Sequence, residues 1–144
     1  MRDFFGDHAR ERLVPAQQCQ ETRLARTLRE RGACPEGVVA LCMSRSVESV
    51  AAMRAVAMTG AAFVPVDPTY PADRIAFMIA DSGARIVVTT AADRERLDGA
   101  EATAAAGAID ADDPDLYAAT TPAGPVDTQV VRHLDQLAYL IYTS

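Results

Sequence analysis

Residues 60–75 read GAAFVPVDPTYPADRI, and this stretch contains the signals for one strand and for the start of one helix. The apolar run 61–66 predicts a short buried strand. Pro65 is expected at the end of that strand, because a proline cannot donate a hydrogen bond to a central ladder. Residues 67–71 contain two prolines with restricted φ angles and therefore predict a rigid loop. Pro71 suits the first position of the helix that follows.

The alternation of strand and helix continues on both sides of this stretch. Upstream, residues 38–43 (VVALCM) predict a buried strand, and Ser46 is expected to cap a helix that ends at Gly60. Downstream, residues 85–90 (RIVVTT) predict a third strand. Strands that alternate with helices imply right-handed crossovers and parallel pairing. The predicted fold class is therefore α/β, a partial parallel sheet with helices on its faces.

The segment before the first strand contains two parts. Residues 1–20 are expected to be a lead-in without a defined element, and residues 21–31 predict an amphipathic helix. Residues 21–144 are therefore predicted to belong to one domain, which agrees with a length of 144 residues.

The segments after the third strand are less regular. Residues 91–107 predict a surface helix. Residues 108–127, rich in aspartate and proline, predict a solvated loop or linker, with one short strand possible near Ala108-Ile109. Leu137–Tyr142, again nearly all apolar, predicts a last buried strand.

Composition excludes several classes of partner. The net charge of −6 argues against binding to nucleic acids or anionic membranes, and no apolar run is long enough to span a bilayer. The N-terminus has no signal-peptide pattern, so a cytoplasmic location is expected. All 14 basic residues are arginine.

No residue pattern predicts a metal site or a catalytic residue. The cysteines, Cys19, Cys34 and Cys42, are odd in number and have no C-x-x-C spacing, which favours incidental thiols. The aspartates around residue 112 lack the glycine and the glutamate of a calcium loop. His133 has the chemistry of a general base, but a surface histidine beside Asp135 is the favoured interpretation.

Two segments together resemble core motifs of the amino-acid adenylation domains of nonribosomal peptide synthetases, members of the adenylate-forming enzyme family. Residues 60–75 resemble the family pattern L-K-A-G-x-A-Y-V-P-I-D-P-x-Y-P-x-x-R-I. Residues 137–144, LAYLIYTS, resemble L-A-Y-x-I-Y-T-S-G, which in the family continues into a phosphate-binding loop with a lysine. The resemblance extends over residues 23–90. It implies the N-terminal part of the large subdomain of such an enzyme.

The sequence departs from the family at two places. Met58-Thr59 stand where the family has lysine and alanine. Residues 14–18 (VPAQQ) stand where a T-Y-x-E-L motif is expected.

The resemblance assigns cofactor contacts to Thr143 and Ser144, at the start of the phosphate loop. As residues beyond the carboxyl end of a strand, they are well placed to begin an anion cradle. In this chain alone we expect no tight binding of ATP or magnesium, because the rest of the loop and any lysine are missing. Arg74 has the charge to bind a phosphate or carboxylate. The favoured interpretation is that Asp67 and Arg74 order the loop and the first helical turn, with a direct pair of the two as one option.

The resemblance implies a function and its partners. In the family, ATP and an amino acid form an aminoacyl adenylate, and the acyl group passes to a phosphopantetheine thiol on a carrier domain. We expect this chain to be a truncated adenylation domain that is inactive alone, with a complementary chain as one way to complete it. A non-catalytic α/β interaction module and a fragment of an acyl-CoA ligase remain the alternatives. The amino acid stays unassigned.

Overall fold

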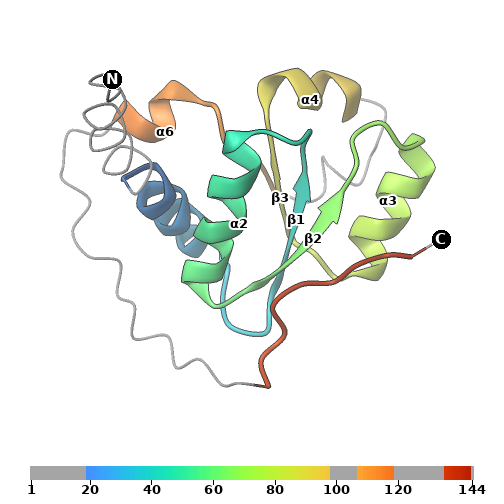
Figure 1. Ribbon diagram of the computed structural model, residues 1–144, viewed down its shortest axis with the longest axis horizontal. Helices are drawn as coiled ribbons and strands as arrows, with labels where there is room; N and C mark the ends of the chain where they lie inside the picture. Colours follow the sequence, from blue (N-terminus) through green and yellow to red (C-terminus); the bar gives the residue numbers. More distant parts are fainter. Residues whose placement is uncertain (1–18, 98–106, 119–134, 144) are drawn as a thin grey trace, which may run out of the picture.

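A four-stranded parallel sheet forms the centre of the molecule (Figure 1). The structure, a computed structural model, describes residues 19–97, 107–118 and 135–143. The strands are β1 (Val38–Cys42), β2 (Ala62–Val66), β3 (Ile86–Thr89) and β4 (Gly107–Asp110), in the order β2-β1-β3-β4. β1 pairs with β2 on one side and with β3 on the other, and β3 pairs with β4. The predicted α/β class is confirmed.

Helices cover both faces of this sheet. The helical residues 19–30 and helix α2 (Val47–Thr59) lie on one face. Helices α3 (Ala72–Asp81) and α4 (Ala91–Leu97) lie on the other, and α6 (Pro114–Ala118) follows β4. No helix among the described residues is both long enough and apolar enough to cross a membrane.

Two hydrophobic clusters, one on each face, hold the layers together. In β1 the buried side chains alternate between them: Val39 and Leu41 face the first helix pair, and Ala40 and Cys42 face α3 and α4. In β3, Val88 joins the first cluster and Val87 the second. This two-sided burial explains why the strands read as continuous apolar runs.

Helix α2 begins and ends as the sequence predicts. The Ser46 hydroxyl accepts a hydrogen bond from the Ser49 amide at 3.2 Å, and the Ser49 hydroxyl accepts one from the Ser46 amide at 3.1 Å. These reciprocal bonds form a capping box. Gly60 ends the helix at φ 82°, a left-handed conformation that favours glycine. Pro71, expected at the first helical position, instead occupies the N-cap of α3.

The segment 108–127 contains more regular structure than a loop or linker. The short strand expected near Ala108-Ile109 is β4, and α6 follows it. Arg23 donates a hydrogen bond to the carbonyl of Tyr117, which ties α6 to the N-terminal helix. Residues 119–127, like 1–18, lie outside the described part of the chain.

The predicted last buried strand is wrong in its burial and its length. Leu137, Tyr139 and Ile141 are 42%, 54% and 63% exposed. The segment makes a single parallel bridge, from Tyr139 to Phe63 at the edge of β2. There the Phe63 amide donates to Ala138 at 3.2 Å, and the Leu140 amide donates to Phe63 at 2.9 Å.

Pro65 explains why this pairing stops after one bridge. Residues 63 and 65 of β2 direct their backbone groups to the same side, because these directions alternate along a strand. The next rung of the ladder needs an N–H group at position 65, and proline has none. Pro65 lies one residue before the end of β2, and its side chain is exposed.

The N-cap of α2 gives a testable prediction for stability. Replacing Ser46 by alanine removes the acceptor for the Ser49 amide, so we expect the free energy of unfolding to fall by about 1 kcal/mol. Urea denaturation measures this change. Ser46→Asp, which keeps a capping oxygen, is the matched control and is expected to retain the stability; equal loss in both variants would contradict the role of the cap.

Candidate functional site

A groove of about 620 Å³ lies at the carboxyl edge of the sheet, next to the ends of β1 and β2. Its walls include Ser44 and Arg45 after β1, residues 65–70 around the end of β2, and Ile141 and Tyr142 of the C-terminal segment. The chain leaves β1 toward β2 and later returns to the other side of β1 as β3. The groove therefore lies beside a switch in strand order, where open parallel sheets bind ligands.

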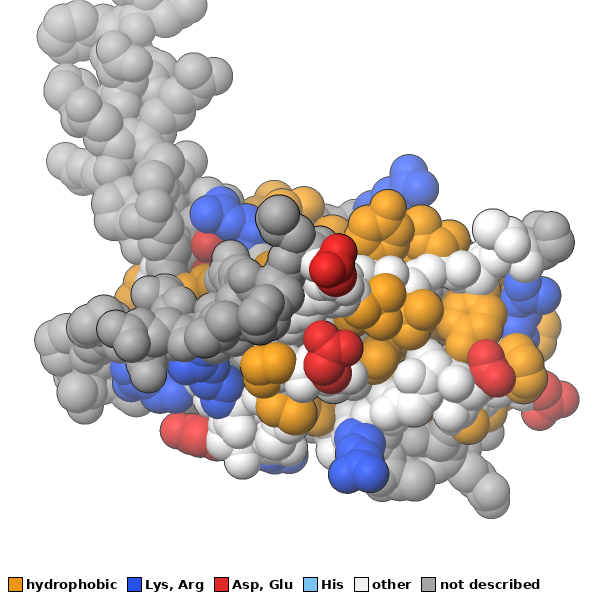
Figure 2. All heavy atoms as spheres, turned by 90° about the horizontal axis from the view of Figure 1, so that it is seen from below, with side chains coloured by type: hydrophobic (Ala, Val, Ile, Leu, Met, Phe, Trp, Pro, Cys, Tyr) orange, Lys and Arg blue, Asp and Glu red, His pale blue; other side chains and the backbone are white. Residues whose placement is uncertain are grey.

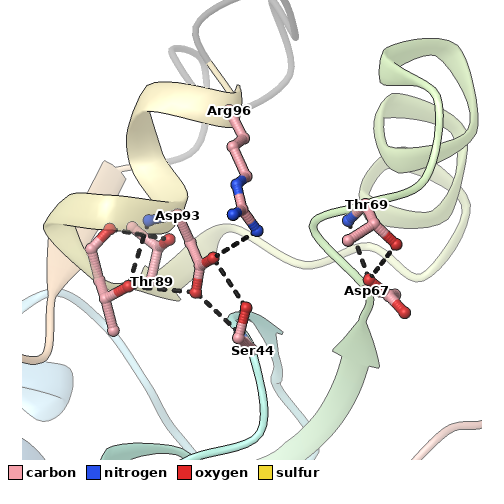
Figure 3. Close-up of polar contacts among 7 residues, drawn as sticks. Ser44, Asp67, Thr69, Thr89, Asp93 and Arg96 are labelled. Carbon is pink, nitrogen blue, oxygen red and sulfur yellow. Dashed lines mark hydrogen bonds and ion pairs between the residues drawn. The ribbon is translucent and has the colours of Figure 1, made fainter.

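The loop after β2 is ordered by its own polar groups. One carboxylate oxygen of Asp67 accepts hydrogen bonds from the Thr69 amide at 2.8 Å and from the Thr69 hydroxyl at 2.7 Å (Figure 3). These bonds from Thr69, with a smaller effect from the charge of Arg45, hold the pKa of Asp67 below its ordinary value. Asp67 is thus kept as an anion that shapes the loop.

Arg74 does not pair with Asp67 in the described structure. Its guanidinium lies over the ring of Tyr70, 5.1 Å from the centroid, as a cation–π contact. The prediction that these residues order the loop and the first turn of α3 agrees with the contacts, but they do so without the direct pairing that was one option for them. Thr69 and Tyr70 are the actual partners.

A second cluster joins the ends of β1 and β3 around Asp93 of α4. The two Asp93 oxygens accept hydrogen bonds from the Ser44 amide at 2.7 Å and the Ser44 hydroxyl at 2.9 Å. The Thr90 hydroxyl donates to Asp93 at 3.1 Å, and Arg96 approaches to 3.6 Å (Figure 3). This carboxylate, only 4% exposed, clamps the loop that forms one wall of the groove.

The cluster keeps Asp93 ionised. Burial raises the pKa of its carboxyl, but the hydrogen bonds from Ser44 and Thr90 and the charge of Arg96 outweigh burial, and the pKa lies below its ordinary value. Sequence reasoning did not identify this site. The pattern Thr90-x-x-Asp93 at the start of a helix is the capping-box signal that could have located Asp93.

The C-terminal segment is anchored beside the groove by Tyr142. Its hydroxyl donates a hydrogen bond to the Asp81 carboxylate at 2.7 Å, and its ring meets Phe77 edge-on with centroids 6.3 Å apart. Burial and the bond to Asp81 raise the pKa of Tyr142 to about 12, so this donor keeps its proton at neutral pH. Thr143 follows as an exposed residue, and Ser144 lies outside the described residues.

Among the described residues, the groups near the groove do not make a complete triphosphate site. The Ser44 hydroxyl is bonded to Asp93 and the Thr69 hydroxyl to Asp67. Arg45 is the cation that lines the groove, and the whole chain contains no lysine. The described ranges also hold no cluster of three side chains suited to a metal ion. No chemical step is therefore assigned to a nucleotide held by these residues alone.

The remaining candidates add no reactive group to the groove. Cys42 is buried in β1, where burial, followed by the charges of Asp93 and Asp67, raises the pKa of its thiol to about 12. Cys34 is exposed and Cys19 half-buried, both as free thiols. His133 lies outside the described residues.

Comparison with known proteins shows which family this sequence resembles. The family model for the AMP-binding enzyme matches residues 18–144. The chain is 41% identical over 143 residues to CymA of Salinispora arenicola, a probable non-canonical nonribosomal peptide synthetase. This alignment covers 96% of this chain and 2% of CymA. It is also 41% identical to tyrocidine synthase 2 of Brevibacillus parabrevis, over 85% of this chain and 3% of that protein.

Solved structures agree with these relatives. The nonribosomal peptide synthetase FmoA3 in its AMPPNP-bound form superposes with a TM-score of 0.76 at 32% identity, covering 89% of this chain and 13% of that one. The N-terminal domain of FACL13 from Mycobacterium tuberculosis gives a TM-score of 0.75 at 26% identity, with 90% of this chain and 34% of that chain covered. The chain thus spans a small part of the relatives' length.

The Asp93 clamp predicts a pH-dependent stability. Folding lowers the pKa of Asp93, so the ionised carboxylate stabilises the fold at pH values above the ordinary pKa of 3.8. This stabilisation is lost as the pH falls through the lower pKa of the folded state. Asp93→Asn places an amide N–H against other donors, so we expect a loss of about 1–3 kcal/mol at pH 7. Urea denaturation at pH 7 and pH 3 measures both effects.

The matched control for this variant is Asp73→Asn, since Asp73 is an exposed aspartate in the first turn of α3. It is expected to change the stability by only a few tenths of a kcal/mol. The stabilising role of Asp93 is refuted if Asp93→Asn is as stable as Asp73→Asn at pH 7 and loses as much stability between pH 7 and pH 3 as the unchanged chain does.

Proposed function

Because this chain belongs to the AMP-binding enzyme family, we propose that it forms the N-terminal part of an amino-acid adenylation domain of the nonribosomal peptide synthetase type. In that role residues 21–144 contribute to a domain that uses ATP to convert an amino acid into an aminoacyl adenylate. The acyl group then passes to the phosphopantetheine thiol of a carrier domain. The adenylate formation releases pyrophosphate and proceeds with Mg²⁺ as the counter-ion.

The placement of the C-terminal segment carries this proposal. Tyr139 pairs in parallel with Phe63 of β2, so the segment runs toward the carboxyl edge of the sheet. Its residues Ile141 and Tyr142 line the groove there, and Thr143 follows directly. This direction supports a role for Thr143 and Ser144 at the start of a loop that binds the phosphates of the nucleotide, through their hydroxyl and amide groups.

The other residues of the groove have a supporting role in this proposal. Asp93 holds the loop after β1, and Asp67 with Thr69 holds the loop after β2. Both loops line the groove that Ile141 and Tyr142 also line. A lysine that stabilises charge at the α-phosphate belongs to the family's chemistry, and this chain has none. We therefore propose that the chain alone neither holds ATP tightly nor catalyses the reaction.

An acyl-CoA ligase is the second candidate function. The 26% identity to the solved fatty acyl CoA synthetase of Mycobacterium tuberculosis, with a TM-score of 0.74, favours it. The 41% identity to two peptide synthetases and the pattern D-P-x-Y-P-x-x-R-I at residues 67–75 favour amino-acid activation. A non-catalytic interaction module derived from the same scaffold is the remaining alternative.

The exchange of radioactive pyrophosphate into ATP tests the proposed function. The chain alone is expected to give no amino-acid-dependent exchange. Co-expressed with the part of the tyrocidine synthase 2 adenylation domain that follows the aligned stretch, it is expected to give exchange with at least one of the twenty standard amino acids. Exchange driven only by fatty acids would favour the acyl-CoA ligase, and no exchange with any acid would favour the interaction module.

In the same reconstituted enzyme, Thr143→Ala is expected to raise the KM for ATP at least tenfold, because it removes a hydroxyl from the proposed phosphate contact. Thr143→Ser keeps that hydroxyl and is expected to retain a KM near that of the unchanged chain. Equal KM values for all three proteins would contradict the assignment of Thr143.

A further inference from the structure

The C-terminal segment is held at two places by contacts of different chemical character. In its first half, the Leu140 amide donates to the Phe63 carbonyl at 2.9 Å, and the Tyr139 ring stacks on the Phe63 ring with centroids 5.9 Å apart. Figure 2, which views the molecule from below, the side along which the segment runs in Figure 1, shows hydrophobic side chains gathered there. Apolar contact is non-directional, so it keeps the segment near the sheet without fixing where the segment's end points.

The backbone ladder does not fix the end of the segment either. Within the described ranges the segment forms one isolated bridge, between Tyr139 and Phe63. The next hydrogen bond from β2 would need an N–H group at Pro65, and proline has none. The ladder therefore weakens where the segment approaches the carboxyl edge of the sheet, and a side chain has to direct the residues that follow.

The Tyr142 side chain supplies the second contact, against the second half of α3. Its hydroxyl donates a hydrogen bond to the Asp81 carboxylate at 2.7 Å and also lies 3.4 Å from the Met78 carbonyl oxygen. Its ring meets Phe77 edge-on with centroids 6.3 Å apart. One phenol thus joins the end of the segment to three residues of a helix that is packed on the sheet.

The position of Asp81 shows why this hydrogen bond is favourable. Asp81 is the last residue of α3, where the free carbonyl groups give the helix end a partial negative charge. A carboxylate at that end does not stabilise the helix, whereas a hydroxyl that donates to it offsets the unfavourable charge. A hydrogen bond to an ionised acceptor is also shorter and stronger than one between neutral groups, and it is directional.

We infer that the hydrogen bond between Tyr142 and Asp81 is a latch that positions the end of the C-terminal segment at the groove. Ile141 and Tyr142 line the groove, and Thr143 follows directly. The latch sets the direction in which the chain enters the phosphate contact proposed for Thr143, so Tyr142 and Asp81 are positioning residues. The inference rests on the proposed function for the identity of the ligand, whereas the latch itself is a property of this chain.

Backbone order parameters from nuclear magnetic resonance of the chain alone test the latch without any activity. Tyr142→Phe removes the hydroxyl and keeps the ring. We expect the order parameters of the amides at positions 141 and 142 to fall from about 0.85, typical of rigid backbone, to about 0.6 or below. The amide of Leu140, which is bonded to Phe63, is expected to stay rigid. Asp81→Ala is expected to act as Tyr142→Phe does.

Tyr117→Phe is the matched control. The Tyr117 hydroxyl donates to the Ala111 carbonyl at 2.6 Å, and Ala111 belongs to the hydrophobic cluster on the face of the sheet opposite α3. This variant also loses one buried-side phenol hydrogen bond, but it is expected to leave the amides at positions 141 and 142 unchanged. Circular dichroism of each variant separates local loss of order from loss of folding.

The reconstituted enzyme tests what the latch positions. Tyr142→Phe and Asp81→Ala are each expected to raise the KM for ATP about fivefold, the effect of losing one hydrogen bond. The KM for the amino acid is expected to stay within about twofold, because the latch acts on the phosphate contact. Tyr117→Phe is expected to change neither value. A parallel rise of both KM values in the Tyr142 variant would indicate general loss of structure and would contradict positioning.

The outcomes separate this inference from the proposed function. If the unchanged enzyme gives no pyrophosphate exchange, adenylation is refuted, and a loss of order confined to positions 141 and 142 in Tyr142→Phe still supports the latch. Exchange with a KM for ATP that Tyr142→Phe leaves unchanged overturns the positioning role and leaves adenylation standing. Equal order parameters in Tyr142→Phe and Tyr117→Phe overturn the latch.

Discussion

The parallel pairing of β1 with β2 and β3 is the constraint on which the rest of the structure depends. β1 lies between the other two strands and places buried side chains on both faces, so it needs a helical layer on each side. The crossovers that supply these layers are α2 and α3. Parallel pairing also brings the ends of β1, β2 and β3 to one edge, where the groove and the Asp93 clamp lie.

Pro65 shows how one backbone group decides the limit of this sheet. A proline near the end of β2 keeps the bond pattern toward β1 but removes the donor on the other side. The C-terminal segment is consequently held by one bridge, by the Phe63–Tyr139 stack and by the bond from Tyr142 to Asp81. These contacts keep the segment against the edge of β2.

The polar groups at the carboxyl edge mainly stabilise loops in the described structure. Ser44 and Thr69 satisfy carboxylates of this chain, and the charges of Asp67 and Asp93 are balanced by local donors. This use of the hydroxyls explains why the edge has the geometry of a ligand site without a complete set of phosphate-binding groups. The proposed adenylation chemistry needs groups from further residues, and the loops that these hydrogen bonds hold line the groove beside them.

The sequence by itself determined the α/β class, the first three strands, the limits of α2 and the family, because these depend on local apolar periodicity, caps and short motifs. Only the tertiary structure decided that Ser44 and Asp93, 49 residues apart, form a clamp, and that Thr69 rather than Arg74 is the partner of Asp67. It also decided that Leu137, Tyr139 and Ile141 are exposed while Leu140 and Tyr142 pack against the second hydrophobic cluster. An apolar run indicates what prefers burial, whereas burial itself depends on which other elements lie against it.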